Sequence, residues 1–185
     1  EGFVASVRAV YPNSGTSIYD LTSNAYNWTM VNSPTFFSTY PKCMNFDGSD
    51  DVLILTADIA APSTGAGISL PSANSWSWTF WFKTSAANGV FLSHAGSGPV
   101  YCAFRVISSY LSYRHYNSGW IDDSSTTTNV ADGLWHCATF VNSANTMIIY
   151  LDGNVEKTSF SSTATNALNP VNMIGAYVYT DLFNG

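Results

Sequence analysis

The chain has 185 residues and a formal net charge of −6, with 46% hydrophobic and only 10% charged residues. This length fits a single domain with a full core, and the composition excludes a disordered chain. The acidic balance argues against nucleic acid as a partner, because phosphate binding needs clustered Lys and Arg. No apolar run is long enough to insert into a membrane.

Short apolar runs bounded by turn residues predict an all-β chain. Apolar residues alternate or cluster over a few positions, and none follows helical spacing for more than two turns. The predicted strands are Val4–Tyr11, Trp28–Val31, Cys43–Phe46, Asp51–Leu55, Ser75–Lys83, Val90–His94, Tyr101–Ile107, Tyr110–His115, Leu134–Val141, Thr146–Leu151, Val155–Phe160 and Val171–Gly175. So many strands require two layers, and the predicted fold class is a two-sheet antiparallel β-sandwich.

Three Asp-Gly pairs predict tight turns. Asp152-Gly153 directly follows a predicted strand and predicts a hairpin, because these residues tolerate the positive φ angles that such a turn requires. Asp47-Gly48 and Asp132-Gly133 predict turns ahead of two further strands.

The segment 75–82 predicts a strand with one face in the core. Trp76, Trp78, Phe80 and Phe82 share that face with period two. Each contributes about 2–3 kcal/mol when fully buried, so we expect this strand at the centre of the sandwich.

Ordered motifs along the chain resemble the laminin-G-like, concanavalin A-like jelly-roll family. They are Asp20-Leu21-Thr22-Ser23-Asn24, Trp28 to Phe36 with its Asn-Ser-Pro bend, Phe46-Asp47-Gly48, Trp78-Thr79-Phe80-Trp81-Phe82, Val90-Phe91-Leu92-Ser93, Asp132-Gly133-Leu134-Trp135-His136, Ile149-Tyr150-Leu151-Asp152-Gly153, Ile174-Gly175 and Phe183-Asn184-Gly185. The resemblance implies a concanavalin A-like jelly roll over residues 1–185.

The end of the chain departs from the family pattern. In the family, Phe-Asn-Gly leads into a last strand, whereas this chain stops at Gly185. We therefore expect a domain that lacks its last strand or receives it from a partner. An open sheet edge of this kind predicts a protein partner or self-association.

Catalytic residues of the family are not found in this sequence. Glycan hydrolysis needs two carboxyl groups across the scissile bond, and the only glutamates are Glu1 and Glu156. The polysaccharide lyases of this fold use Arg, His and Tyr; Arg105, Arg114, His115 and Tyr113 supply these types without the flanking motifs. The sequence predicts a non-enzyme and leaves a polysaccharide-degrading enzyme as an alternative.

The remaining histidines and the cysteines are interpreted as structural. His136 follows Trp135, which we expect in the core, and neither His136 nor His94 has an identifiable orienting acid. Cys43, Cys102 and Cys137 are an odd set without metal-ligand spacing, so at most one internal disulfide can form.

One segment combines aromatic and planar polar side chains in the way that sugar binding requires. A pyranose stacks its apolar face on Trp or Tyr, and its hydroxyls bond to Asp, Asn, Arg or His. The candidate glycan-binding residues are Trp120, Tyr113, Arg114, His115, Tyr116 and Asp122. Trp120, expected in a loop, is the first choice for an exposed platform; the alternative is that these aromatics are ordinary strand or core residues.

Asp47, Asp50 and Asp51 offer hard oxygen ligands near a predicted turn. The simpler interpretation is that Asp47 caps the turn while the other two are solvated. The alternative is a Ca²⁺ site, since some relatives bind Ca²⁺ at a rim and this ion takes six to eight oxygens.

The function predicted from the sequence is a non-catalytic carbohydrate-binding, lectin-like adhesion module. The segment Tyr11 to Asp20 also resembles versions of the module in virion-surface and tail-fibre proteins, which implies an extracellular or virion-surface location. The alternative function is a structural or assembly domain of a virion protein without glycan binding.

Overall fold

The computed structural model describes residues 16–37, 42–55, 75–93, 102–116, 120–123, 126–143, 146–160, 172–176 and 182–185. The strands are β1 (Ser17–Ile18), β2 (Trp28–Val31), β3 (Thr35–Phe37), β4 (Cys43–Asn45), β5 (Val52–Leu55), β6 (Ser75–Lys83), β7 (Gly89–Ser93), β8 (Cys102–Ile107), β9 (Tyr110–Tyr116), β10 (Trp120–Asp123), β11 (Trp135–Ser143), β12 (Thr146–Leu151), β13 (Asn154–Phe160) and β14 (Met173–Ile174). Within these residues, no helix is long and apolar enough to cross a bilayer.

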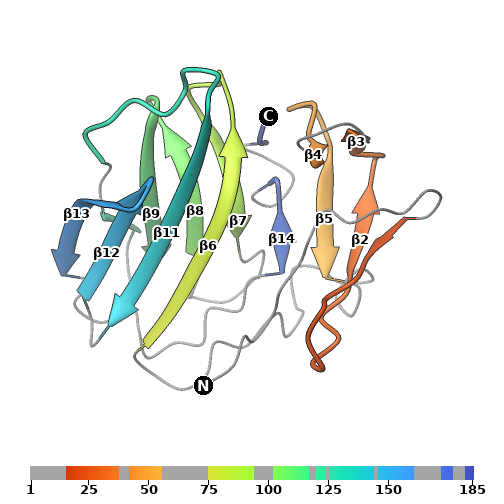
Figure 1. The fold of residues 1–185 in the computed structure, drawn as a ribbon, viewed down its shortest axis with the longest axis horizontal. Coiled ribbons are helices and arrows are strands. Elements are labelled where there is room, and N and C mark those ends of the chain that lie inside the picture. The colour runs from red at the N-terminus through yellow and green to blue at the C-terminus, as the bar shows by residue number, and fades with distance from the viewer. Residues whose placement is uncertain are drawn as a thin grey trace.

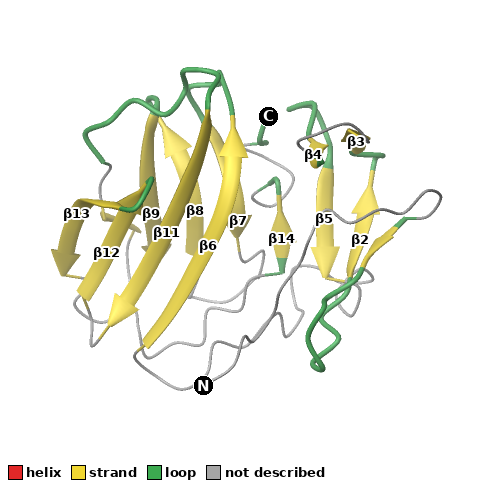
Figure 2. Cartoon of the chain, in the orientation of Figure 1, coloured by secondary structure: helices red, strands yellow, loops and turns green. Residues whose placement is uncertain are grey.

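Two antiparallel sheets pack face to face. The larger has the order β1-β2-β5-β14-β7-β8-β9-β10, the smaller has the order β13-β12-β11-β6, and β3 pairs separately with β4. The smaller sheet lies in front of β7, β8 and β9 in Figure 1, and the described part of the chain in Figure 2 contains strands and loops but no helix. This arrangement confirms the predicted two-sheet β-sandwich.

Most predicted strands coincide with observed ones. Trp28–Val31, Ser75–Lys83 and Thr146–Leu151 match to the residue, and other strands differ by one or two residues at their ends. The short strands β1, β3 and β10 were not predicted. The predicted strand Val4–Tyr11 lies outside the described residues.

The core between the sheets is built on aromatic rings. Phe82 is buried, Trp76, Trp78 and Phe80 pack against the core, and Trp81 on the opposite face is exposed, which confirms the predicted inner face of β6. The ring of Phe80 lies 4.9 Å from that of Phe91 on the larger sheet. Rings from both layers therefore interlock.

The expected central position of β6 is wrong for the described part of the chain. There β6 ends the smaller sheet and pairs only with β11, whereas β11 has a neighbour on each side. The alternation of side chains reports which face of a strand is buried, but it carries no information on how many strands flank it.

The predicted turns are confirmed. Asp152 and Gly153 have φ angles of +51° and +84° between β12 and β13, and Gly48 and Gly133 both have φ of +76°. A fourth tight turn, Ser108-Ser109 between β8 and β9, has φ angles of +50° and +74° without any glycine.

Trp135 does not lie in the core, which corrects the expectation. Its side chain is 37% exposed on the outer face of β11, while the next residue, His136, is 8% exposed and points inward, with its ring 5.7 Å from that of Phe82. The pairing of β11 with β6 decides this, because Ala138 and Phe140 must face the core and even-numbered residues share their side.

The final residues pack beside the turn after β4. Gly185 N–H donates to Phe46 O at 3.1 Å and Phe46 N–H donates to Gly185 O at 3.0 Å. The ring of Phe183 lies 4.8 Å from that of Phe91. The expectation that a last strand is lacking or supplied by a partner stays a prediction.

Candidate functional site

The β9–β10 hairpin holds the predicted glycan-binding residues. Trp120 pairs with Tyr116, and Asp122 pairs with Arg114, so these four positions lie opposite one another across two strands. Directly paired residues share a sheet face, and neighbours along a strand alternate. Positions 114, 116, 120 and 122 therefore occupy one face of the larger sheet.

The backbone places Trp120 differently from the expectation. It begins β10, the last strand of the larger sheet, rather than lying in a loop. Trp120 was expected in a loop because it follows Gly119, but its pairing with Tyr116 makes it part of the sheet.

Tyr113 belongs to the core, which corrects its assignment as a sugar ligand. Its side chain is 3% exposed, and its ring lies 5.2 Å from that of Phe104 and 5.9 Å from that of Trp76. A buried ring cannot stack on a sugar. By alternation, His115 occupies the same face as Tyr113.

Two of the three arginines occupy neighbouring positions on the face opposite Tyr113. Arg105 pairs with Ser112 and Arg114 pairs with Ala103, so the two are diagonal neighbours on β8 and β9. Because His115 and Tyr113 occupy the other face, the lyase-type residues are divided between the two sides of the sheet. That separation removes the structural basis for a lyase site formed by these four residues.

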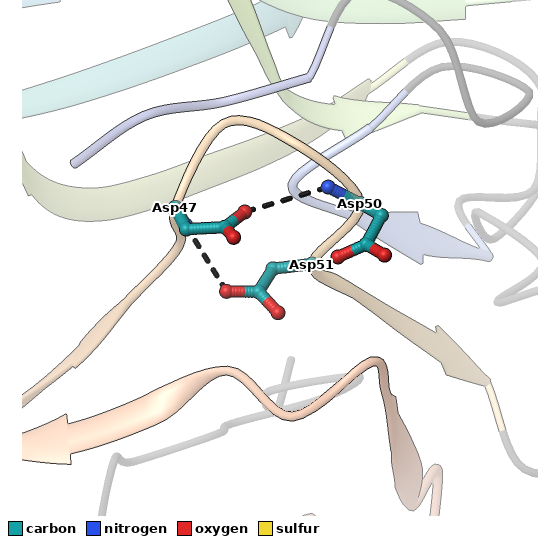
Figure 3. Close-up of side chains that lie close together, drawn as sticks. All are labelled: Asp47, Asp50 and Asp51. Atoms are coloured by element: carbon teal, nitrogen blue, oxygen red, sulfur yellow. Dashed lines mark hydrogen bonds between the residues drawn. The ribbon is translucent and has the colours of Figure 1, made fainter.

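The three aspartates come together in the loop between β4 and β5, as Figure 3 shows. One carboxylate oxygen of each lies within 4.8 Å of those of the other two. Asp47 Oδ1 accepts hydrogen bonds from Ser49 N–H at 2.7 Å and Asp50 N–H at 3.4 Å. The prediction that Asp47 caps the turn is confirmed.

Asp51 is buried rather than solvated, which corrects the simpler interpretation. Its Oδ2 accepts from Asp47 N–H at 3.0 Å, and the side chain is 5% exposed. Burial raises the pKa of Asp51 above its ordinary value, and the charges of Asp47 and Asp50 add to the rise. Three hard carboxylates this close fit a Ca²⁺ ion chemically, because the cation would relieve their repulsion.

His136 is hydrogen-bonded on both ring nitrogens. Nδ1 lies 2.8 Å from Asp152 Oδ2, and Nε2 lies 3.2 Å from Asp132 Oδ1. The sequence did not identify these acids because they belong to two different turns. The ring holds the turns together, which supports the structural interpretation of His136.

A match to a protein-family model shows which family the chain belongs to. Residues 56–185, more than two thirds of the chain, match the family model described as the concanavalin A-like lectin/glucanases superfamily, a laminin G-like family. The chain belongs to this superfamily.

Solved structures show the same concanavalin A-like fold in binding domains. Domain 4 of AbnA, an extracellular GH43 arabinanase from Geobacillus stearothermophilus, in complex with arabinotriose, has a TM-score of 0.69 and 14% identity over 90% of this chain and 82% of that one. The binding domain of botulinum neurotoxin DC, in complex with rat synaptotagmin II, has a TM-score of 0.62 and 15% identity over 92% of this chain and 43% of that one.

Mouse laminin α1 domains LG4-5 have a TM-score of 0.55 and 14% identity over 80% of this chain. The concanavalin A-like chain spans only 37% of that laminin structure. No curated protein sequence matches the chain. At these identities the likeness concerns the fold, and activity has to be argued from the site.

Glu156 has structural partners in this concanavalin A-like chain. Its carboxylate accepts from Thr128 Oγ1 at 2.8 Å and from Thr127 N–H at 3.3 Å. These contacts tie the 126–130 segment to β13. Glu156 is therefore engaged in holding a loop, and Glu1 lies outside the described residues.

Proposed function

We propose that this domain is a non-catalytic, lectin-like module that binds carbohydrate on the face of the β9–β10 hairpin occupied by positions 114, 116, 120 and 122. The observation that carries the proposal is the register, which pairs Trp120 with Tyr116 and Asp122 with Arg114. Two aromatic and two charged hydrogen-bonding residues thus share a small area, as a shallow sugar site requires. Tyr113 and His115 have no ligand contact in this proposal.

The similar structures support a binding role without naming a ligand. The arabinanase domain was solved in complex with arabinotriose, and cell entry of botulinum neurotoxin type C depends on interaction with two ganglioside molecules. Glycan recognition is one use of the shared fold, and synaptotagmin binding is a protein-directed one. The proposal takes residues 1–185 as one domain in an extracellular or virion-surface setting.

Calcium is the cofactor that the proposal includes. The carboxylates of Asp47, Asp50 and Asp51 would hold it, and a bound Ca²⁺ supplies a fixed charge at the rim of the sandwich. Asp51 contributes a buried ligand oxygen, and Asp47 shapes the loop through its turn hydrogen bonds.

A glycan array probed with and without Ca²⁺ tests the proposal. We expect Trp120→Ala to weaken the wild-type hits by about tenfold or more, roughly 1.4 kcal/mol. Tyr19→Ala, which removes a 66% exposed aromatic ring directly after β1, is the matched control and keeps the hits. An array without hits under both conditions contradicts glycan binding and favours the structural or assembly domain.

The non-catalytic part of the proposal has its own test. Incubation with common polysaccharides is followed by assays for reducing ends and for unsaturated products. We expect neither, because the lyase-type residues are on opposite faces and Glu156 is engaged by threonines. Product formation that exceeds a heat-inactivated control contradicts this part and favours a polysaccharide-degrading enzyme.

A further inference from the structure

A second aromatic surface lies on the outer face of the smaller sheet. Trp81 on β6 is 68% exposed and Trp135 on β11 is 37% exposed. Val155 on β13, which pairs with Tyr150, is also exposed, so three of the eight exposed large apolar side chains among the described residues lie here. This sheet is the layer nearest the viewer in Figure 1.

The strand register brings the two indoles together. Trp81 pairs with Cys137, and Trp135 pairs with Lys83, so the tryptophans are diagonal neighbours on one face. Diagonal neighbours on adjacent strands are separated by roughly 7–8 Å between backbones, which indole rings readily span. We call this exposed pair of neighbouring positions the Trp81–Trp135 platform.

Hydroxyl groups lie in the next row of the same face. Thr79 pairs with Thr139, and their Oγ1 atoms lie 3.0 Å apart, so one hydroxyl donates to the other. Since only one of the two hydroxyl groups donates within the pair, the hydrogen of the other remains available to a ligand. Tyr150 pairs with Thr139 from the other side and continues the row.

The charges around the platform favour a neutral ligand. Lys83 is the cation paired with Trp135, and the acids of the adjacent turns, Asp132 and Asp152, both contact His136. The indoles and threonine hydroxyls themselves carry no charge. An acidic or a strongly basic partner would gain little here.

We propose that the Trp81–Trp135 platform is a second carbohydrate-binding site, which takes a neutral oligosaccharide of at least two sugar units. Sugar C–H faces stack on the indoles, and sugar hydroxyls bond to the Thr79–Thr139 row. A second copy of the chain fits less well, because homodimer interfaces have mostly apolar cores, whereas this face carries a lysine beside its tryptophans and a pair of threonines in the next row. The platform is on the opposite sheet from the hairpin site and does not depend on it.

Binding of neutral oligosaccharides of one to six units, measured by calorimetry and by the shifts of indole N–H signals in NMR spectra, tests the proposal. We expect Trp81→Ala to weaken binding about tenfold or more and single sugars to bind much less well than longer chains. Trp81 is largely exposed, so this variant keeps the wild-type fold and melting temperature. Tyr19→Ala is the matched control and keeps wild-type affinity.

Comparing the Trp120→Ala and Trp81→Ala variants separates this site from the proposed hairpin site. Trp120→Ala leaves the affinity of the platform unchanged, whereas Trp81→Ala leaves the hairpin ligands bound. If Trp81→Ala keeps full affinity, or if no neutral oligosaccharide shifts an indole signal, the platform is not a sugar site. If Trp81→Ala instead converts a dimer into a monomer in light scattering, the face is a self-association surface and the proposal is overturned.

Discussion

His136 and Asp152 are joined by a hydrogen bond of 2.8 Å between Nδ1 and Oδ2. Asp152 is the first residue of the β12–β13 turn, and its other carboxylate oxygen accepts from Cys137 N–H at 2.8 Å. The pair therefore fastens a positive-φ turn to the beginning of β11. On the opposite side of the ring, Asp132 extends the link to the turn that precedes Trp135.

The pair predicts a pH optimum of stability. Burial, the largest influence, lowers the pKa of His136, but hydrogen bonds and charges from Asp152 and Asp132 together raise it above its ordinary value of about 6.5. The contribution of His136 to the free energy of unfolding is fully present at a pH below its ordinary pKa, and it is lost as the pH rises through the raised pKa.

The pKa of Asp152 shifts the other way. Burial, the largest influence, raises the pKa. The hydrogen bonds from Cys137 N–H and His136 and the charge of His136 together outweigh burial, so the pKa of Asp152 lies below its ordinary value of about 3.9. Its contribution is present above that value and is lost as the pH falls through the lowered pKa. Both contributions are complete between about pH 4 and pH 6.5.

Urea unfolding from pH 4 to pH 9 measures this effect on the free energy of unfolding. We expect the wild type to lose stability above about pH 6.5 and His136→Gln to lose that pH dependence. A histidine variant with the same pH profile as wild type contradicts the assignment.

Calcium and the Asp51 carboxylate give a second prediction. Because burial and neighbouring charges raise the pKa of Asp51, its ionisation at neutral pH opposes folding in the absence of a cation. Asp51→Asn keeps an oxygen for Asp47 N–H, so we expect an unchanged or higher melting temperature without Ca²⁺. With Ca²⁺ at about 100 times its Kd, the wild type gains about 2.7 kcal/mol and the variant gains less. Equal shifts in both proteins, measured by calorimetry, exclude Asp51 as a ligand.

The Ser108-Ser109 turn predicts a stabilising substitution. Ser109 has φ of +74°, a region that costs a residue with a side chain roughly 1 kcal/mol or more. Ser109→Gly relieves this cost and keeps the backbone bonds to Ala87 and Val130. We expect the free energy of unfolding to rise by about 1 kcal/mol, whereas Ser109→Ala, which retains Cβ, brings no such gain.

Among core substitutions, we expect truncation of Phe104 to cause the largest loss of stability. Its side chain is fully buried, with ring centroids 5.0 Å from Phe140 and 5.2 Å from Tyr113. Phe104→Ala leaves a cavity and lowers the free energy of unfolding by about 3–5 kcal/mol in chemical denaturation. Phe37→Ala, which removes a half-exposed ring, costs less than about 1 kcal/mol; similar losses for the two variants contradict the packing described.

Local sequence patterns predict the strands with long alternation and the turns with special residues. The aromatic face of β6 and the Asp152-Gly153 hairpin follow from local chemistry, since side chains alternate along a strand and Gly accepts positive φ without steric cost. The sequence also shows that aromatic and planar polar groups crowd together near Trp120.

Which of these groups face the core depends on contacts that form only in the folded chain. Tyr113 is buried by Phe104 on the neighbouring strand and by Trp76 from a distant one, and Trp135 lies on the outer face because Ala138 and Phe140 of the same strand face the core. Burial and hydrogen bonding at these positions depend on contacts between strands far apart in the chain. A residue type alone therefore does not reveal whether its partner is the core or the solvent.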